Sequence, residues 1–338
     1  MTECKVGIIA NPASGKDIRR LVSQALVIGN REKASIVRRM LVGLHAAKAD
    51  QVWIMPDKFG IGTLAIDELE RTYPDTVKNV EILDMEYSGT GIDTIRAMRF
   101  MRQMGAGCIL VLGGDGTSRL AARECENVPL LPVSTGTNNV LPQFIEGTIA
   151  GLAAGLVARA YPAKLDGMVY RSKALDVIVN GTKADSALVD VAALEGSFLG
   201  SKAVWEMDSL RQVAVTRASP VNIGLSAIVG MVHPVDMDSP EGAMLRVEQA
   251  GRQRVQAAVA PGLMKEICYE SVSIMQPGVL YPITAERPLV LALDGEREIY
   301  LGEHDQASLQ LRLDGPWLVD IDKVMMQAAR EKIFVSQQ

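Results

Sequence analysis

Five short apolar runs, separated by segments with helical periodicity, constrain the fold of this chain more than any other feature. The runs cover residues 6–10, 52–55, 80–83, 108–112 and 130–133. Helical segments are expected at residues 17–47, with a break near 29–30, and at 62–71, 92–104 and 118–125. This alternation indicates βα units around a parallel sheet. Because the runs are apolar throughout rather than alternating with polar residues, the sheet is expected to be covered on both faces.

The sequence changes character after residue 142. A helical stretch at 144–158 precedes short β-rich runs separated by Gly, Pro and Asn. These runs lie at 174–180, 187–194, 212–215, 255–259, 289–293 and 309–313. They predict an antiparallel, sandwich-like β domain. We therefore expect an α/β domain over 1–140, a β-rich domain over 141–316, and a final segment, 317–338, that returns to the first domain.

Composition and charge exclude several classes of protein. Of the 338 residues, 48% are hydrophobic and 22% charged, which is typical of a folded globular chain. The net charge of -5, without a basic cluster, argues against nucleic acid as a partner. The four cysteines, at positions 4, 108, 125 and 268, have no zinc or disulfide spacing. No run is long enough to span a membrane, so we expect a cytoplasmic protein without a membrane partner.

The fourth apolar run leads directly into Gly113-Gly114-Asp115-Gly116-Thr117, which opens a helix. Ligands of open α/β sheets bind at the carboxyl ends of strands, so this turn faces a crevice. Glycines allow backbone amides to approach phosphate oxygens at a helix N-terminus. A carboxylate among those amides suits Mg²⁺ binding or acceptance of a hydroxyl proton, which makes Asp115 a candidate for either role. The alternative is that Asp115 only caps the helix.

Two further polar turns follow the first and fifth apolar runs. The first is Asn11-Pro12-Ala13-Ser14-Gly15-Lys16, which lacks the glycine and hydroxyl positions of a Walker A loop but suits phosphate binding. The other is Ser134-Thr135-Gly136-Thr137-Asn138-Asn139, whose hydroxyls and amides suit ribose or adenine edges. Each alone is also compatible with an ordinary connection or a helix cap. Three such turns after three strands predict one nucleotide site.

These motifs resemble the superfamily that joins NAD kinases with diacylglycerol and sphingosine kinases, and within it the ATP-NAD kinase branch typified by the acetoin-catabolism protein AcoX. Two later segments extend the resemblance. Residues 225–234 are similar to the LSAGGPIVHP stretch of NAD kinases, and Leu293-Asp294-Gly295-Glu296 is similar to a DG or DGE turn found in both branches. The resemblance implies a Rossmann-like N-terminal domain, a β-rich C-terminal domain and an active site between them.

The chain also differs from this superfamily. NAD kinases carry a TPTGSTAY segment before LSAGGPIVHP, and residues 216–224 keep little of its hydroxyl pattern. An Asn138-Asn139 pair stands where the relatives have Asn-Asp or Asn-Glu. These differences concern the phosphate acceptor rather than the kinase scaffold.

The resulting hypothesis is an ATP-dependent kinase that uses Mg²⁺ and phosphorylates a hydroxyl, with the ribose 2′-hydroxyl of NAD as the leading acceptor. The three turns would bind the nucleotide. Asp115 is preferred as the base that accepts the hydroxyl proton, with Asp294 as its rival. The alternatives are a lipid or small-alcohol kinase of the diacylglycerol kinase type and a non-catalytic nucleotide-binding regulator linked to acetoin catabolism. By analogy with relatives, a homo-oligomer is expected.

Overall fold

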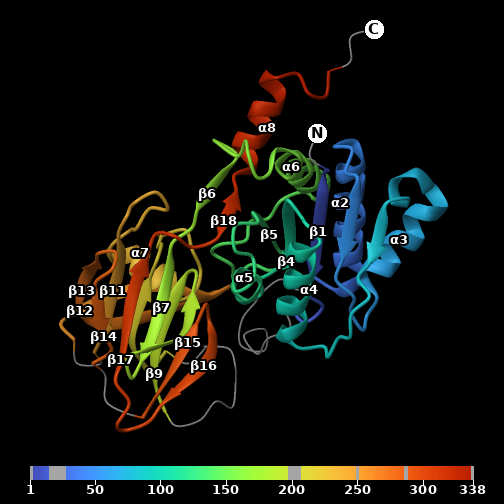
Figure 1. The fold of residues 1–338 in the computed structure, drawn as a ribbon. Helices are drawn as coiled ribbons and strands as arrows, with labels where there is room; N and C mark the ends of the chain where they lie inside the picture. The colour runs from blue at the N-terminus through green and yellow to red at the C-terminus, as the bar shows by residue number, and fades with distance from the viewer. Residues whose placement is uncertain (1–2, 15–27, 197–206, 249–250, 285–287, 336–338) are drawn as a thin grey trace.

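The computed structural model describes residues 3–14, 28–196, 207–248, 251–284 and 288–335. Figure 1 shows two parts, one with helices around a sheet and one built mainly of strands. The first part holds seven strands, in the spatial order β3 (Val80–Ile82), β2 (Gln51–Ile54), β1 (Lys5–Ala10), β4 (Cys108–Gly113), β5 (Leu130–Ser134), β18 (Trp317–Val319) and β6 (Val169–Arg171). The strands from β3 to β18 are parallel, and β6 is antiparallel to β18.

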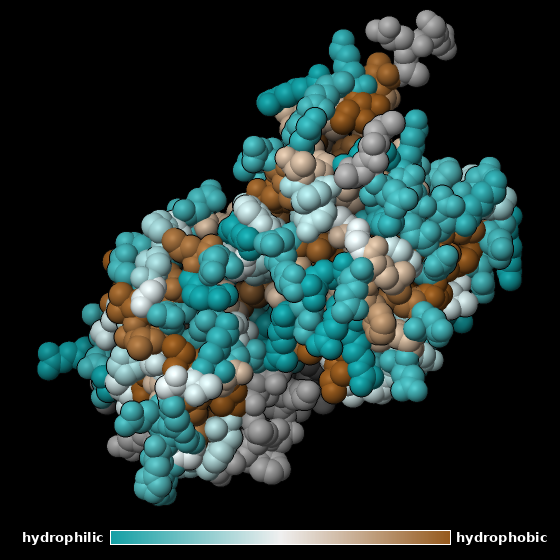
Figure 2. Space-filling model, viewed as in Figure 1, coloured by the Kyte–Doolittle hydropathy of each residue, from teal (hydrophilic) through white to brown (hydrophobic). Residues whose placement is uncertain are grey.

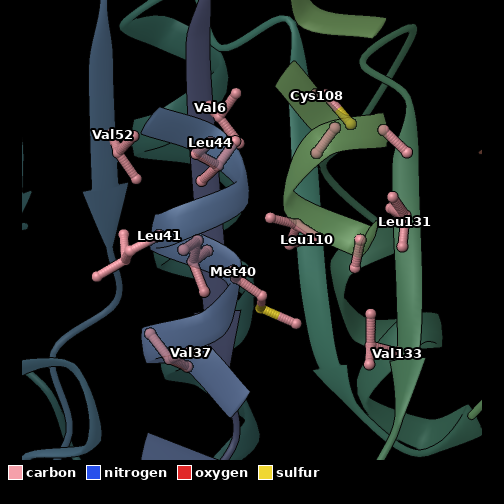
Figure 3. Packing of buried hydrophobic residues seen from close by; sticks show 14 of the residues in the cluster. Val6, Val37, Met40, Leu41, Leu44, Val52, Cys108, Leu110, Leu131 and Val133 are labelled. Carbon is pink, nitrogen blue, oxygen red and sulfur yellow. The ribbon is translucent and has the colours of Figure 1, made fainter. Parts of the chain in front are cut away.

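Helices cover both faces of this sheet. They are α2 (Asn30–Ala46), α3 (Ile61–Thr72), α4 (Gly91–Gln103), α5 (Asp115–Ala122), α6 (Gly147–Ala160) and α8 (Ile321–Arg330), with a short 3₁₀ helix, η1 (Pro74–Val77), after α3. Successive residues of β1 point to opposite faces: Ile8 joins the core under α2, α3, α6 and α8, whereas Ile9 joins the core under α4 and α5. Figure 3 shows Met40 and Leu44 of α2 directed at the strands. The predicted parallel α/β fold is confirmed.

Helices α2 and α6 pack at backbone distance, because glycines line their contact. A Cβ atom added at Gly43 of α2 would lie 2.1 Å from the carbonyl oxygen of Thr148, and one added at Gly151 of α6 would lie 2.1 Å from that of Met40. Gly147, one turn earlier on α6, meets the carbonyl oxygen of Ile36 in the same way, at 2.7 Å. Side chains at these positions would force the helices apart.

The second part consists of two antiparallel sheets. The larger one runs in the order β12 (Gln253–Ala260), β13 (Leu263–Met275), β11 (Gly242–Val247), β10 (Leu210–Val215), β9 (Asp190–Glu195), β15 (Leu289–Leu293) and β16 (Glu296–Leu301), and the smaller in the order β14 (Leu280–Pro282), β17 (Ala307–Arg312), β7 (Ala174–Val179) and β8 (Thr182–Ala187). Apolar residues such as Val177, Leu291 and Leu309 fill the space between them. This arrangement confirms the predicted β-rich second part.

Helix α7 (Leu225–Val232) covers the other face of the larger sheet, where Ile228 packs with strand residues such as Val213. The sequence analysis assigns no helix to this segment. Its residues are apolar on all sides, so no polar face marks the helical period.

The chain crosses between the two parts more than once. Strand β18 near the C-terminus pairs with β5, and α8 packs against α6, so the end of the described chain lies on the first sheet. Strand β6 also joins that sheet, and α6 packs against it. Both lie in the segment 141–316, which the sequence analysis assigns to the second domain. The domain bounds themselves stay a prediction.

Among the described residues, no helix is both long and apolar enough to span a membrane. The face drawn in Figure 2 is largely hydrophilic, and its apolar residues are spread over separate patches.

Candidate active site

The three polar turns predicted from the sequence lie together at the carboxyl ends of β1, β4 and β5. The amide Nδ2 of Asn11 donates a hydrogen bond to Oγ1 of Thr117, at 2.9 Å. The hydroxyls of Ser14 and Thr135 are 3.0 Å apart, which joins the first turn to the third. This proximity follows from the strand order, because parallel neighbours end at the same edge of a sheet. Gly15 and Lys16 lie outside the described residues.

Asp115 is buried at the first position of α5. Its carboxylate accepts hydrogen bonds from the backbone N–H groups of Val140, at 2.9 Å, and Leu141, at 2.8 Å. These bonds hold the chain after the third turn against the start of α5. A negative charge at this position is also favoured by the helix dipole.

The glycines of the second turn allow close approach. A Cβ atom at Gly113 would lie 2.6 Å from Cβ of Thr117, and one at Gly114 would lie 2.8 Å from Oδ1 of Asn139. A side chain at either position would displace a residue of the predicted nucleotide site.

The third turn is held by its own polar groups. The hydroxyl of Ser134 donates to the carbonyl oxygen of Gly136, at 2.7 Å, and Nδ2 of Asn139 donates to Oγ of Ser134, also at 2.7 Å. By contrast, Oγ1 of Thr137 and Oδ1 of Asn138 are buried, with no hydrogen-bond partner among the described residues. Because unpaired buried polar atoms are costly, both need an explanation, and Asn138 also lines the small cavity described below.

Lys33, on the first turn of α2, supports the first turn, and sequence reasoning missed it. Its side chain is fully buried. Its ammonium Nζ donates to the carbonyl oxygens of Asn11, at 2.8 Å, Pro12, at 3.3 Å, and Ser14, at 2.9 Å. A lysine in a helix is usually read as solvent-exposed, so no local signal distinguishes it.

A cleft of about 560 Å³ opens in front of the first and second turns. Asn11, Gly116 and Thr117 line it, together with Glu296 and the loop 89–95 before and at the start of α4. A Cβ atom at Gly116 would lie 2.9 Å from Oε1 of Glu296, so the second part of the chain contributes a carboxylate to this cleft.

The loop before α4 is a fourth polar turn that the sequence analysis did not single out. The carboxylate of Asp93 accepts hydrogen bonds from the N–H groups of Ser88, at 2.8 Å, and Gly89, at 2.6 Å. The side chain of Thr90 caps α4. The spacing of Thr90 and Asp93 is that of a capping box, which was the available signal.

Asp294 forms the turn between β15 and β16. Asp294 and Gly295 have φ angles of 50° and 79°, the positive pair that a two-residue hairpin requires. The carboxylate of Asp294 is buried and accepts hydrogen bonds from the N–H groups of Leu188, Val189 and Asp190, the shortest being 2.7 Å. Burial raises the pKa of this carboxyl group, against the effect of Arg119 and of these backbone donors. This environment suits a structural role.

A smaller cavity of about 30 Å³ lies between the two parts. Asp115, Asn138, Asp190 and Asp294 line its polar side, and Met207, Ile223, Leu225 and Val259 are among its apolar residues. Sequence reasoning missed Asp190, which lies on a buried strand where an acidic residue has no local signature. The start of α5 thus separates two spaces: Gly116 and Thr117 face the larger cleft, and Asp115 faces the smaller cavity.

The donor set fits a magnesium ion only when phosphates share its coordination. Within the described ranges, no group of three or more His, Cys, Asp and Glu side chains is arranged to hold a metal ion. Magnesium is usually bound through one or two carboxylates plus substrate phosphates. Glu296, in the cleft, and Asp115, at the start of α5, lie beside the turn at residues 113–117, and Asp57 and Asp93 also line the cleft.

Comparison with known proteins supports the family resemblance that the sequence motifs indicate. Residues 6–161 match the ATP-NAD kinase N-terminal domain, and residues 173–314 match the acetoin catabolism protein X C-terminal domain. Acetoin catabolism protein X of Cupriavidus necator is 36% identical over 98% of this chain and 94% of its own length. NAD kinase 2 of Thermosynechococcus vestitus is 26% identical over 60% of this chain and 63% of its own length.

Among solved structures, yeast NADH kinase complexed with NADH aligns with 99% of this chain and 89% of its own, at 13% identity and a TM-score of 0.48. The two domain matches and the full-length relative agree with the motifs at the site. The chain therefore belongs to the NAD kinase superfamily, in its AcoX-like branch.

Proposed function

We propose that the chain is an ATP-dependent phosphotransferase that transfers the γ-phosphoryl group of ATP to a hydroxyl group, the ribose 2′-hydroxyl of NAD. The observation that supports this proposal most is the position of the start of α5 between the larger cleft and the smaller cavity. The cleft of about 560 Å³, lined by Asn11, Gly116 and Thr117, is the size of a nucleotide pocket. The cavity on the other side of the helix start holds Asp115 and the buried oxygen of Asn138.

In this proposal the backbone of residues 113–117 binds phosphate oxygens at the N-terminus of α5. The acceptor hydroxyl oxygen attacks the γ-phosphorus, the bond to the leaving ADP breaks, and the hydroxyl proton passes to the carboxylate of Asp115. Magnesium bound to the phosphates would neutralise their charge, with Glu296 and Asp115 as the nearby carboxylates. Asn11 and Thr117 would position the nucleotide, and Thr137 and Asn138 would offer polar atoms to the acceptor.

Asp115 is a better candidate for the base than Asp294. Asp294 is enclosed by three backbone donors and forms a hairpin turn. Asp115 also accepts two backbone N–H groups and lines the same small cavity, but of the two only Asp115 belongs to the turn at residues 113–117. We therefore assign Asp294 the role of holding the hairpin that presents Glu296.

The decisive experiment incubates purified protein with Mg-ATP and NAD and measures NADP. The expected result is NADP formation, reduced roughly 10²-fold or more in turnover by Asp115→Asn, because the amide cannot accept the proton. ATP affinity, measured on the same variant, separates loss of the base from a shift of the backbone at Val140 and Leu141, which the carboxylate holds. Near-normal turnover in this variant would remove Asp115 from the role of base.

A second candidate function is supported by the size of the smaller cavity. At about 30 Å³, it is too small in the described conformation for a dinucleotide half. This observation favours a nucleotide-binding regulator linked to acetoin catabolism, or a kinase for a small alcohol. If NADP does not form, ATP consumption measured against a panel of small alcohols separates these two: consumption indicates a kinase, and ATP binding without consumption indicates a regulator.

We also propose a cytoplasmic homo-oligomer. All four cysteines are free thiols, which is consistent with a reducing compartment. The oligomeric state is tested by light scattering coupled to size-exclusion chromatography, where a mass of one chain, 36.5 kDa, would contradict the proposal.

A further inference from the structure

A second cavity lies between the two parts of the chain beside the C-terminal end of α5, and it shares Arg123 with the cleft of the candidate active site. Its volume is about 620 Å³. Five cationic side chains line it. They are Arg119 on α5, Arg123 directly after α5, Arg171 on β6, Lys183 on β8 and Arg312 on β17. We call it the arginine cavity. The proposed catalytic turns do not line it.

Among the residues that the structure describes, the cationic side chains of this cavity outnumber the carboxylates that contact them. Two carboxylates are each shared by two cations. Asp185 contacts Arg119, at 2.7 Å, and also Arg123. Asp176 contacts Lys183, at 2.9 Å, and Arg312, at 3.3 Å. Taken alone, each of these carboxylates offsets the charge of only one of its two cations.

Arg171 adds a cation that has no carboxylate within ion-pair distance in the described chain. Its guanidinium donates to the carbonyl oxygen of Gly315, at 2.8 Å, and to Oδ1 of Asn127, at 3.0 Å. It also lies over the ring of Trp317, 4.3 Å from the ring centroid. These neutral contacts fix the guanidinium without cancelling its charge.

Two further carboxylates reduce the excess among the described residues to one charge, that of Arg171. Asp314 lies 3.5 Å from Arg312, and the buried Asp294 lies 3.8 Å from Arg119. Counting these with Asp176 and Asp185, five cations face four carboxylates. Glu126 also lines the cavity but is paired with Arg102. Nε of Arg312 is the atom that makes both of its ion pairs, and neither has hydrogen-bond geometry.

We propose that the arginine cavity is a second ligand site, which binds a small molecule bearing a phosphate group. Guanidinium groups match phosphate oxygens with paired donors, and a phosphate monoester carries about -1.5 to -2 charges, enough to offset the excess. The volume is within the range of small-molecule pockets. Because α5 and β6 belong to the first part and β8 and β17 to the second, a bound phosphate would bridge the two. This proposal does not depend on the kinase activity.

The experiment titrates the full-length protein with inorganic phosphate by isothermal calorimetry at low ionic strength, where charge attraction is least screened. We expect saturable binding that weakens about tenfold or more in Arg171→Gln and in Lys183→Gln, each of which removes one cation. The matched control is Arg254→Gln, because Arg254 forms an exposed ion pair with Glu266 on the β12–β13 hairpin, away from the cavity.

Two results would overturn the proposal. One is the absence of saturable phosphate binding to the unmodified protein. The other is binding that survives in both cavity variants but is lost in Thr117→Ala, which would place the phosphate in the proposed nucleotide cleft instead. Lys183 is on an edge strand and half exposed, so its variant keeps the test valid if Arg171→Gln does not fold.

Discussion

Replacing Lys33 with methionine tests how the first polar turn is held in place. The side chain is fully buried, and its ammonium donates to three carbonyl oxygens of the turn, two of them at 2.8 and 2.9 Å. A hydrogen bond from a charged donor contributes about 1.5 to 3 kcal/mol. Methionine keeps most of the volume and avoids burying a charge, which offsets part of the loss. We therefore expect Lys33→Met to lower the free energy of unfolding by about 2 to 4 kcal/mol.

The assay is urea unfolding followed by circular dichroism, with ATP affinity measured on the folded variant. Affinity should fall as well, because Asn11 and Ser14 lose the contact that fixes their backbone. The control is Lys78→Met, since Lys78 is exposed and its only described ion pair is with Asp75. That variant should unfold like the unmodified protein. If Lys33→Met were as stable as the unmodified chain, the three carbonyls would not depend on the ammonium, and our account of the turn would be wrong.

Three further predictions concern packing and thiol chemistry. Gly151→Ala should lower the free energy of unfolding by about 2 kcal/mol or more, because the new methyl group meets backbone atoms of α2; Gly29→Ala, with no atom within 4 Å of its added methyl, should cost less than about 1 kcal/mol. At pH 8, the thiol reagent DTNB should modify Cys268 first, and rapid modification of a second thiol in the folded chain would contradict the described burial. Burial raises the pKa of Cys4 from 9.0 to about 11. Between pH 9 and about 11, the Cys4 thiol of the unfolded chain loses its proton while that of the folded chain keeps it. The free energy of unfolding should therefore fall as pH rises through this range. In urea titrations at several pH values, Cys4→Ala should reduce this pH dependence.

The sequence predicts the parallel sheet well, because its signals are local. Each apolar run becomes a strand, and all but the edge strand β3 are buried. The turn at 113–117 opens α5 as expected, although the helix starts at Asp115 rather than at 118. The convergence of the turns also follows from general rules, since neighbouring parallel strands end together. The contact between Ser14 and Thr135 is therefore a consequence of strand order.

Other features depend on contacts between distant residues and have no local signature. Lys33 has the spacing of an ordinary helical lysine, and only the turn packed above it explains its burial. Helix α7 lacks a polar face and cannot be distinguished from a strand by periodicity. In the sequence, Asp294 is compatible with both a turn residue and a base, and only the three backbone donors at residues 188–190, where β9 begins, indicate the structural role.

The glycine contact between α2 and α6 limits how these two helices can move relative to each other. With main chains touching main chains, neither helix can slide along the other without a clash of carbonyl groups. Lys33, near the N-terminal end of α2, donates hydrogen bonds to the turn at 11–14. Strand β6, which follows α6 in the chain, carries Arg171 of the arginine cavity. We expect the two helices to move as one body, so that a displacement felt at β6 also reaches the loop that would hold ATP.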